Sequence, residues 1–346
     1  MKWSSLVQAY RLALAACAFC ALPLFAADNL ELEKAKTWFR EGNIDEAVAL
    51  LERMITTSTL SREDRVEALE VLAYCNVAKQ REPNVQSSFA QILTINAGYE
   101  PRDSYLSHPA VMRAWMNARK QVLGNVAIAP PSGIKTIAIL DFDNNAIDDA
   151  DKLANLGKGL ADILITDLTA LTKLKVLERE RIQFIVEEIQ RNEATVAGQQ
   201  AVDPNFAVQV GKLLGAQSVL FGSYMKFGKK LRLDVRLVKT ETSEIIKTNF
   251  IEGSPEDIFD LSKKLAIKIS EDLEVALNKV EEEKVERIRK EDIPLEAAMA
   301  YSEALNLLDQ ERYNDARSML TKALALAPSF RLARTKLTLL QTFQKG

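Results

Sequence analysis

Residues 217–252 restrict the fold more than any other part of the chain, because they contain three predicted strands separated only by short turns. In the second strand, residues 230–239, four apolar side chains alternate with charged ones: Leu231, Leu233, Val235 and Leu237. Such alternation is typical of a strand with one face buried and the other in solvent. The short turns predict antiparallel hairpins. The sequence therefore predicts an antiparallel sheet that helices cover on one face.

The residues before and after these strands predict an α/β domain. A buried strand rich in β-branched residues is expected at 134–142, and a short strand at 175–177. Helices are expected at residues 156–171, residues 179–191, after Asp203-Pro204, and from Pro255 to about Leu277. We expect these elements and the three strands to form one α/β sandwich with a mixed sheet.

Both ends of the chain are helical and contain a matching segment. Residues 39–51 align with residues 308–320: Phe39 matches Leu308, Ile44 matches Tyr313, Ala47 matches Ala316, and Leu51 matches Leu320. Two short helices with Ala at their crossing resemble a tetratricopeptide repeat (TPR), although Glu311 replaces the usual turn glycine. A solenoid of such repeats needs about three copies to be stable alone. We therefore expect these helices to pack on the central domain or on partner proteins.

These features predict a multi-domain α+β fold with an α/β centre and all-α helical hairpins on both sides. The expected parts are a signal peptide (1–26), a TPR-like helical domain (27–122), a Pro-rich linker (123–133), the α/β domain (134–277), a charged connecting helix (278–293) and a C-terminal TPR-like repeat (294–346). The length of 346 residues fits two or three domains.

The N-terminus has the parts of an export signal. Lys2 and Arg11 supply positive charge before an unbroken apolar run, which is shorter than the roughly 20 residues that span a bilayer. We favour cleavage after Ala26 or Ala27, which places the protein in the periplasm. The segment before Cys17 also resembles the lipid-attachment motif of bacterial lipoproteins. Only five apolar residues separate Arg11 from Cys17, so lipidation is the second choice.

The inventory of reactive side chains is small. The chain has one histidine, His108, and three cysteines, of which Cys17 and Cys20 lie in the predicted signal peptide. Cys75 lies in a helical run and is expected to be a core residue. Very few histidine and cysteine residues are therefore present from which a Ser-His-Asp triad or a His/Cys metal site could be built. We therefore expect no enzyme, no cofactor and no metal.

Nucleic acid is not an expected partner either, because 45 Lys and Arg residues are balanced by 48 Asp and Glu residues. Two short motifs that suggest a ligand are incomplete. Gly157-Lys158-Gly159 lacks the Ser or Thr that follows the lysine of a P-loop, so we interpret its glycines as packing positions. Residues 141–152 resemble a calcium loop, but Ala146 and Lys152 replace its Gly and its bidentate Glu. We expect an exposed acidic loop there.

Two groups of charged residues are interpreted as surface. Acidic and basic residues interleave in a predicted helix and indicate a solvated helix face: Glu178, Arg179, Glu180, Arg181, Glu187, Glu188 and Arg191. A second group makes one hairpin basic: Lys226, Lys229, Lys230, Arg232 and Arg236. We interpret it as a solvated face, with an anionic lipid headgroup or glycan as the alternative partner.

The central elements also carry a family resemblance. Its segments are 137–142, 156–162, 175–181, 211–216, 219–223 and 231–238. In this order they resemble the CsgG-type domain of curli assembly, and more distantly the N-terminal domain of TolB. The resemblance implies a role in assembly or secretion at the inner face of the outer membrane, with no enzymatic activity. In the curli channel, long hairpins near the last strands form the pore, whereas Phe227-Gly228-Lys229 is only a tight turn.

We therefore expect a periplasmic scaffold or assembly factor without a pore. Its partners would be envelope or outer-membrane proteins held by the TPR-like helices, with peripheral association at the outer membrane. Candidate contact residues are Trp38, Ile44, Trp115 and Tyr313, each of which could equally be core. The alternative is a ring-forming CsgG-like secretion subunit, a homo-oligomer through the central domain.

Overall fold

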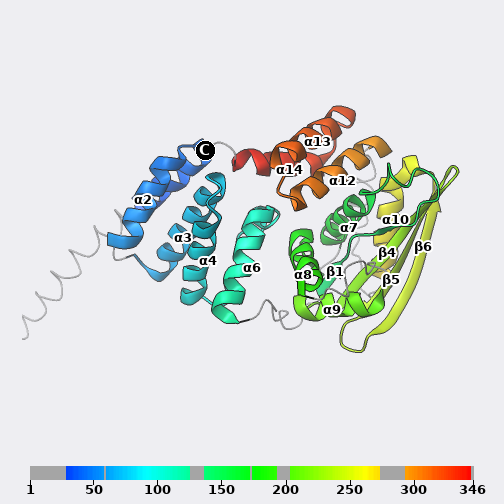
Figure 1. Cartoon of the computed structure of the whole chain (residues 1–346), viewed down its shortest axis with the longest axis horizontal. Coiled ribbons are helices and arrows are strands. Elements are labelled where there is room, and N and C mark those ends of the chain that lie inside the picture. Colours follow the sequence, from blue (N-terminus) through cyan, green and yellow to red (C-terminus); the bar gives the residue numbers. More distant parts are fainter. Residues whose placement is uncertain are drawn as a thin grey trace, which may run out of the picture. The chain divides into compact units, whose positions relative to one another are not determined.

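The structure is a computed structural model, and it describes residues 29–57, 60–124, 136–171, 174–192, 203–272 and 293–343. The predicted signal peptide, most of the predicted linker and nearly all of the predicted charged helix lie outside these ranges. Contacts divide the chain into two compact units (Figure 1). The first comprises residues up to 101 with 117–123 and 341–346, and the second comprises 102–116 and 124–340.

The first unit is built from helical hairpins. After a helix at residues 29–41 follow α2 (Ile44–Thr57), α3 (Arg62–Ala78) and α4 (Glu82–Ile95), together with the end of α6 (Pro109–Leu123). The Ser61 side chain caps α3 by accepting a hydrogen bond from the Asp64 amide at 3.0 Å. Neighbouring helices bury their small and apolar residues against one another, including Ala47, Leu51 and Met54. These helices confirm the predicted all-helical segment.

Among the described residues, the same turn joins two helices at three places. In the first, the Gly42 amide donates to the Phe39 carbonyl at 3.2 Å and the Asn43 amide to the Trp38 carbonyl at 2.9 Å. The same pair of bonds closes the turns centred on Gln80 and Glu311. All three central residues have a positive φ: 88° for Gly42, 54° for Gln80 and 60° for Glu311. The third occurrence, at Gln80, had no counterpart in the sequence alignment.

A mixed sheet forms the second unit. Its order is β3 (Lys175–Val176), β1 (Thr136–Ile139), β4 (Ser218–Phe227), β5 (Lys230–Lys239) and β6 (Glu244–Gly253), with β2 (Asp143–Asn144) pairing beside β4. The first three strands are parallel, and β4, β5 and β6 are antiparallel. The predicted mixed sheet is confirmed. β1 is shorter than expected, because after Ile139 the chain leaves the strand and the Phe142 amide bonds the Gly157 carbonyl instead.

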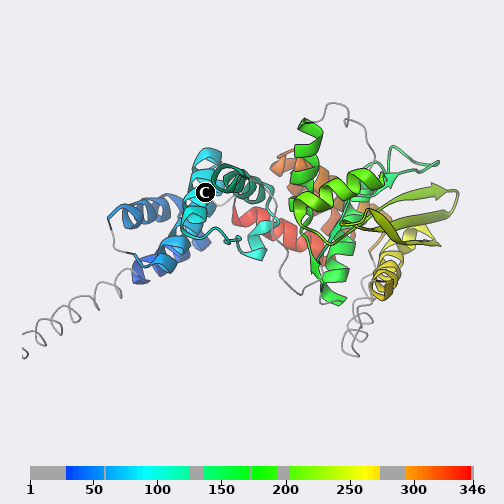
Figure 2. The same cartoon turned by 90° about the horizontal axis from the view of Figure 1, so that it is seen from below.

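Helices cover the sheet as Figures 1 and 2 show. On one face, α7 (Leu156–Leu171), α10 (Ile258–Asp272) and α12 (Leu295–Asp309) share a core with the inward side chains of β5. A 3-10 turn, Pro255–Asp257, precedes α10. α9 (Pro204–Leu214) packs on the opposite face, where Gly211 lies close to Val219 and Thr240. α8 (Arg179–Asn192) packs beside α9 and β1. The short α5 (Asp103–Leu106) also belongs to this unit.

The C-terminal helices belong to the core of the second unit. Residues of α13 (Tyr313–Leu326) and α14 (Arg331–Thr342) join one hydrophobic cluster with residues of α7, α10 and the sheet. Phe330 packs at 5.3 Å from Phe259 of α10 and 4.9 Å from Tyr301 of α12 between ring centroids. Of the two packing arrangements expected for these helices, the structure shows the one on the central domain.

Among the residues that the structure describes, no helix combines the length and the apolar composition needed to cross a bilayer.

Candidate functional site

A cluster of four charged side chains joins four parts of the second unit. Arg179, the first residue of α8, bonds Asp141, which follows β1, through Nε at 3.1 Å and Nη2 at 2.9 Å. The same guanidinium bonds Asp309 at the end of α12, with distances of 2.9 and 2.7 Å. Lys158 of α7 lies 2.7 Å from Asp309 and 3.5 Å from Asp141. One arginine thus holds two carboxylates in paired geometry, which is the strongest form of such a contact.

Burial makes this cluster electrostatically tight. Arg179 is 2% exposed. Burial opposes its charge, but Asp141 and Asp309 raise the pKa of the guanidinium well above its ordinary value. Burial would likewise raise the pKa of Asp309, yet the charge and hydrogen bonds of Arg179 and Lys158 lower it to about 2. The two positive and two negative charges balance, so the cluster is neutral as a whole.

This cluster corrects the prediction that the charged residues of the helix at 179–191 form a solvated face. Arg179, Glu180 and Arg181, expected on a solvated face, are 2%, 6% and 1% exposed. The charged partners of Arg179 and Glu180 are far away in the sequence, and a pattern of i,i+4 charges contains no sign of them, whereas Arg181 lies 3.6 Å from nearby Glu178. The expected surface pairs remain only at the other end of the helix, where exposed Arg191 contacts Glu187 and Glu188. Asp141, expected in an exposed acidic loop, belongs to the buried cluster as well.

Further buried polar contacts continue beside this cluster. Lys336 of α14 forms an ion pair with Glu180, and Tyr301 of α12 donates a hydrogen bond to Asp162 of α7. Burial would lower the pKa of Lys336, but Glu180 and Asp162 raise it. Burial, reinforced by Asp162, raises the pKa of Tyr301. These contacts connect α12 to α7, which the four-residue cluster also joins, and they add a connection from α14 to α8.

His108 completes this region. Its ring stacks on Tyr313 with 5.3 Å between centroids, and it is 3% exposed. Burial and the nearby charge of Lys336 lower the pKa of His108 to about 3. The single histidine of the chain is therefore neutral and packed between elements. Chemically, the whole region is suited to holding α12, α13 and α14 on the sheet unit, since its charges are directed at one another.

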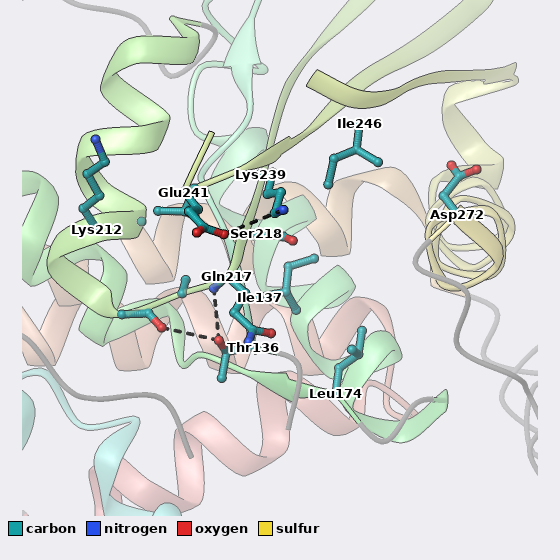
Figure 3. A pocket seen from close by; sticks show the side chains of 14 residues that line it. Thr136, Ile137, Leu174, Lys212, Gln217, Ser218, Lys239, Glu241, Ile246 and Asp272 are labelled. Atoms are coloured by element: carbon teal, nitrogen blue, oxygen red, sulfur yellow. Dashed lines mark hydrogen bonds and ion pairs between the residues drawn. The ribbon is translucent and has the colours of Figure 1, made fainter. Parts of the chain in front are cut away.

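A pocket lies elsewhere, at the end of the sheet where β1 and β4 begin (Figure 3). It has a volume of about 610 Å³, with Ile137, Leu174 and Ile246 among its apolar lining residues. Charged side chains at its rim are Lys212, Lys239, Glu241 and Asp272. Lys239 and Glu241 lie 3.7 Å apart, and Asp272 pairs with Lys247. Three lining residues adjoin segments that the structure does not describe: Thr136, Leu174 and Asp272.

No metal-ligating cluster of His, Cys, Asp or Glu is found among the described residues. The glycines of the incomplete P-loop motif lie where helices pack closely. A Cβ atom at Gly157 would lie 1.9 Å from the Phe142 carbonyl oxygen, and one at Gly159 would lie 2.1 Å from Ser302 Oγ. The glycines therefore allow α7 to approach the segment after β1 and also α12. This agrees with the packing interpretation.

The structure places the four predicted contact residues differently from one another. Trp38 is partly buried, with the Lys34 ammonium 4.5 Å above its ring, and Tyr313 is partly buried against His108. Ile44 is 3% exposed and Trp115 is fully buried, with the Arg181 guanidinium 5.0 Å from its ring centroid. The structure does not bring the four residues together on one surface. Partner contact stays a prediction, and only Trp38 and Tyr313 retain exposed surface for it.

Two further predictions can be placed. Cys75 is fully buried, as expected of a core residue, and burial raises the pKa of its thiol to about 12. The predicted basic hairpin has less net positive charge than its Lys and Arg residues alone would give it, because acidic neighbours pair with most of them. Lys226 pairs with Asp149, Lys230 with Glu252, and Arg232 with Asp234.

One comparison with known protein families agrees with the central elements. The family model described as "Curli production assembly/transport component CsgG" matches residues 119–233. This is about a third of the chain, and the match ends inside β5. No curated protein matches. One similar solved structure is the LpoB C-terminal domain from Salmonella enterica, at 12% identity and a TM-score of 0.24, covering 44% of this chain and 99% of that one. So low a TM-score carries no argument about function.

Sequence reasoning missed the buried cluster, although one signal for it existed. A cation at the first residue of a helix and an anion at the last are both unfavourable in the field of the helix dipole. Arg179 opens α8 and Asp309 closes α12. Such a pair of misplaced charges indicates that each has a partner outside its own helix.

Proposed function

We propose that this protein is a non-enzymatic, exported scaffold or assembly factor of the cell envelope, which acts through protein–protein contacts in the periplasm. The observation that carries the proposal is the match of residues 119–233 to a curli assembly and transport family, on a mixed sheet covered by helices. Export rests on the N-terminal signal pattern, with cleavage after Ala26 or Ala27 favoured over lipidation of Cys17.

The use of polar side chains supports contact over catalysis. In the second unit the buried charges pair with one another: Arg179 with Asp141 and Asp309, and Lys336 with Glu180. A general acid or base needs a site that substrate can reach. The buried carboxylates here instead fix one helix to the next. We assign none of the described residues to an enzymatic role.

The first unit supplies the surface for partners in this proposal. Its hairpins share one turn type, and we infer that they act as TPR-like repeats that hold an envelope or outer-membrane protein. Trp38 is the candidate contact there, and Tyr313 the candidate in the second unit. Large aromatic side chains with exposed surface are frequent anchors of protein interfaces.

Affinity capture from solubilised envelopes tests this proposal. The full chain is expected to recover the same envelope proteins in repeated preparations, and Trp38→Ala or Tyr313→Ala to reduce that recovery. Arg40→Ala is the control, since Arg40 is exposed on the helix that carries Trp38. Melting temperatures of all variants separate lost contact from lost folding. Recovery that is unchanged in both aromatic variants would remove the role given to these residues.

A ring-forming secretion subunit is the second candidate, because the matched family description includes transport. Conductance in planar bilayers, together with a heat-stable assembly of many copies, would favour it. The scaffold proposal predicts neither.

A further inference from the structure

One edge of the sheet is long and regular. β6 is the last strand in the sheet order, and among the described residues no strand pairs with its outer edge (Figures 1 and 2). The opposite edge strand, β3, has only two residues, whereas β6 has ten. The pairing of β6 with β5 is irregular between Leu237 and Val238 and continuous from Lys247 to Gly253. This leaves a regular segment of seven residues, in which every second residue directs its backbone N–H and C=O outward, where another strand can pair.

Common protections of an edge strand are weak along this segment. Natural edges are often blocked by a bulge, by proline or by inward-pointing charge. The irregularity lies at one end of β6, and the segment from Lys247 to Gly253 has no proline. Its one inward-pointing charge, Lys247, lies at the end of the segment and pairs with Asp272. Its middle residue, Phe250, is 50% exposed, which is unusual for an aromatic side chain at the surface.

Side chains of this segment also contact neighbouring elements on both faces of the sheet. Asn249 donates a hydrogen bond to Asp272 of α10, and Lys247 lies 3.7 Å from the same carboxylate. On the outer face, the Arg232 guanidinium of β5 lies 4.1 Å from the Phe250 ring centroid. These contacts already hold β6 in an extended conformation. A second strand can therefore pair with it without the free-energy cost of ordering β6.

The residues of this edge match a second copy of themselves. If two such strands pair antiparallel about a two-fold axis at Phe250, four kinds of facing pair result. They are Phe250 with Phe250, Asn249 with Ile251, Thr248 with Glu252, and Lys247 with Gly253. None of them opposes like charges, which would be destabilising directly across a ladder. The centre of the regular segment is at the same time its most exposed apolar residue.

We propose that two copies of this protein pair through β6, antiparallel and with Phe250 at the two-fold axis, to form one continuous sheet. A two-fold interface of this kind is closed, because both copies use the same edge strand, β6. It differs from the interface of a ring, in which two different surfaces meet. The inference does not rest on the proposed envelope function, because it uses only the edge and its side chains.

Cysteine cross-linking tests the register directly. The full chain carrying Cys17→Ser and Cys20→Ser is the parent, since buried Cys75 is not accessible. Residues that face each other in antiparallel strands have Cα atoms about 4.5–5.5 Å apart, which suits a disulfide. Phe250→Cys is therefore expected to give a covalent dimer under mild oxidation, on the order of tenfold faster than Lys229→Cys at the β4–β5 turn.

A pair of cysteine substitutions tests the same register without changing Phe250. Thr248→Cys alone and Glu252→Cys alone should not cross-link, whereas the double variant should, because each faces the other across the axis. Light scattering of the parent is expected to show the mass of two copies, and Phe250→Lys to shift it toward one.

Three results would overturn the proposal. One is a parent that stays monomeric at every concentration with no cross-link in either design. Another is a larger assembly in which Phe250→Cys fails to cross-link. The third is an edge that binds an extended peptide of another protein while the copies remain separate.

Discussion

Three residues show how the same turn is made from different amino acids. Gly42, Gln80 and Glu311 all have a left-handed backbone with the same two hydrogen bonds. Glycine adopts this conformation freely, while a residue with a Cβ atom is strained by roughly 1–2 kcal/mol. The sequence pattern predicted the turn at Gly42 and its match at Glu311. Gln80 gave no signal, because neither its side chain nor its neighbours mark a left-handed residue.

Replacing Gln80 with glycine should therefore stabilise the first unit. Gln80 is exposed and has a positive φ, so Gln80→Gly relieves strain with little loss of contact. The expected gain is about 0.5–1 kcal/mol in the free energy of unfolding, because greater freedom of the unfolded chain offsets part of the relief. Gly42→Ala should lower that free energy by about 1 kcal/mol. Urea unfolding measures both, and a destabilised Gln80→Gly would contradict the interpretation.

The single histidine predicts a pH dependence. Burial lowers the folded-state pKa of His108 to about 3, below its ordinary 6.5. Protons then bind the unfolded chain but not the folded one as pH falls from about 6.5 to about 3, so stability is lost over that window by up to about 1.4 kcal/mol per pH unit. His108→Phe should flatten this part of the profile. In an untagged chain, NMR should find a His108 ring that does not titrate between pH 8 and 5.

At the scale of elements, local signals predicted most boundaries. α7 runs from Leu156 to Leu171, as expected, because its apolar spacing is a local signal. The burial of the start of α8 could not be predicted in this way. It depends on Asp309 and Lys336, which are more than a hundred positions away and belong to helices assigned to another domain.

Removing Arg179 should release the C-terminal helices from the sheet unit. Arg179→Met leaves Asp141 and Asp309 without their shared partner, and breaking a buried ion pair in this way costs about 3–5 kcal/mol. Arg191→Met is a matched control on the same helix, since Arg191 is exposed, and it should change stability by less than about 0.5 kcal/mol. Hydrogen exchange should rise in α12 and α14 of the first variant only. Equal effects of the two substitutions would refute the role of the cluster.

At the scale of the whole molecule, two compact units account for the multi-domain α+β fold. The sequence predicted the fold class and the sheet, since turn spacing and strand alternation are local properties. Whether the C-terminal helices pack on the sheet or stand apart is decided by tertiary contacts such as Phe330 with Phe259, which no local pattern contains. Partner contact is also decided at this scale, because tertiary packing determines whether an aromatic residue of a repeat lies in the core or at an interface.

The most direct test of a contact function is site-specific photo-crosslinking in living cells. A photoreactive amino acid at position 38 replaces a partly exposed Trp, and the same group at position 40 points to the other side of the same helix. We predict adducts with other envelope proteins from position 38 and far fewer from position 40. The contrary result is a chain that is exported and folded yet forms no adduct from position 38, or forms equal adducts from both.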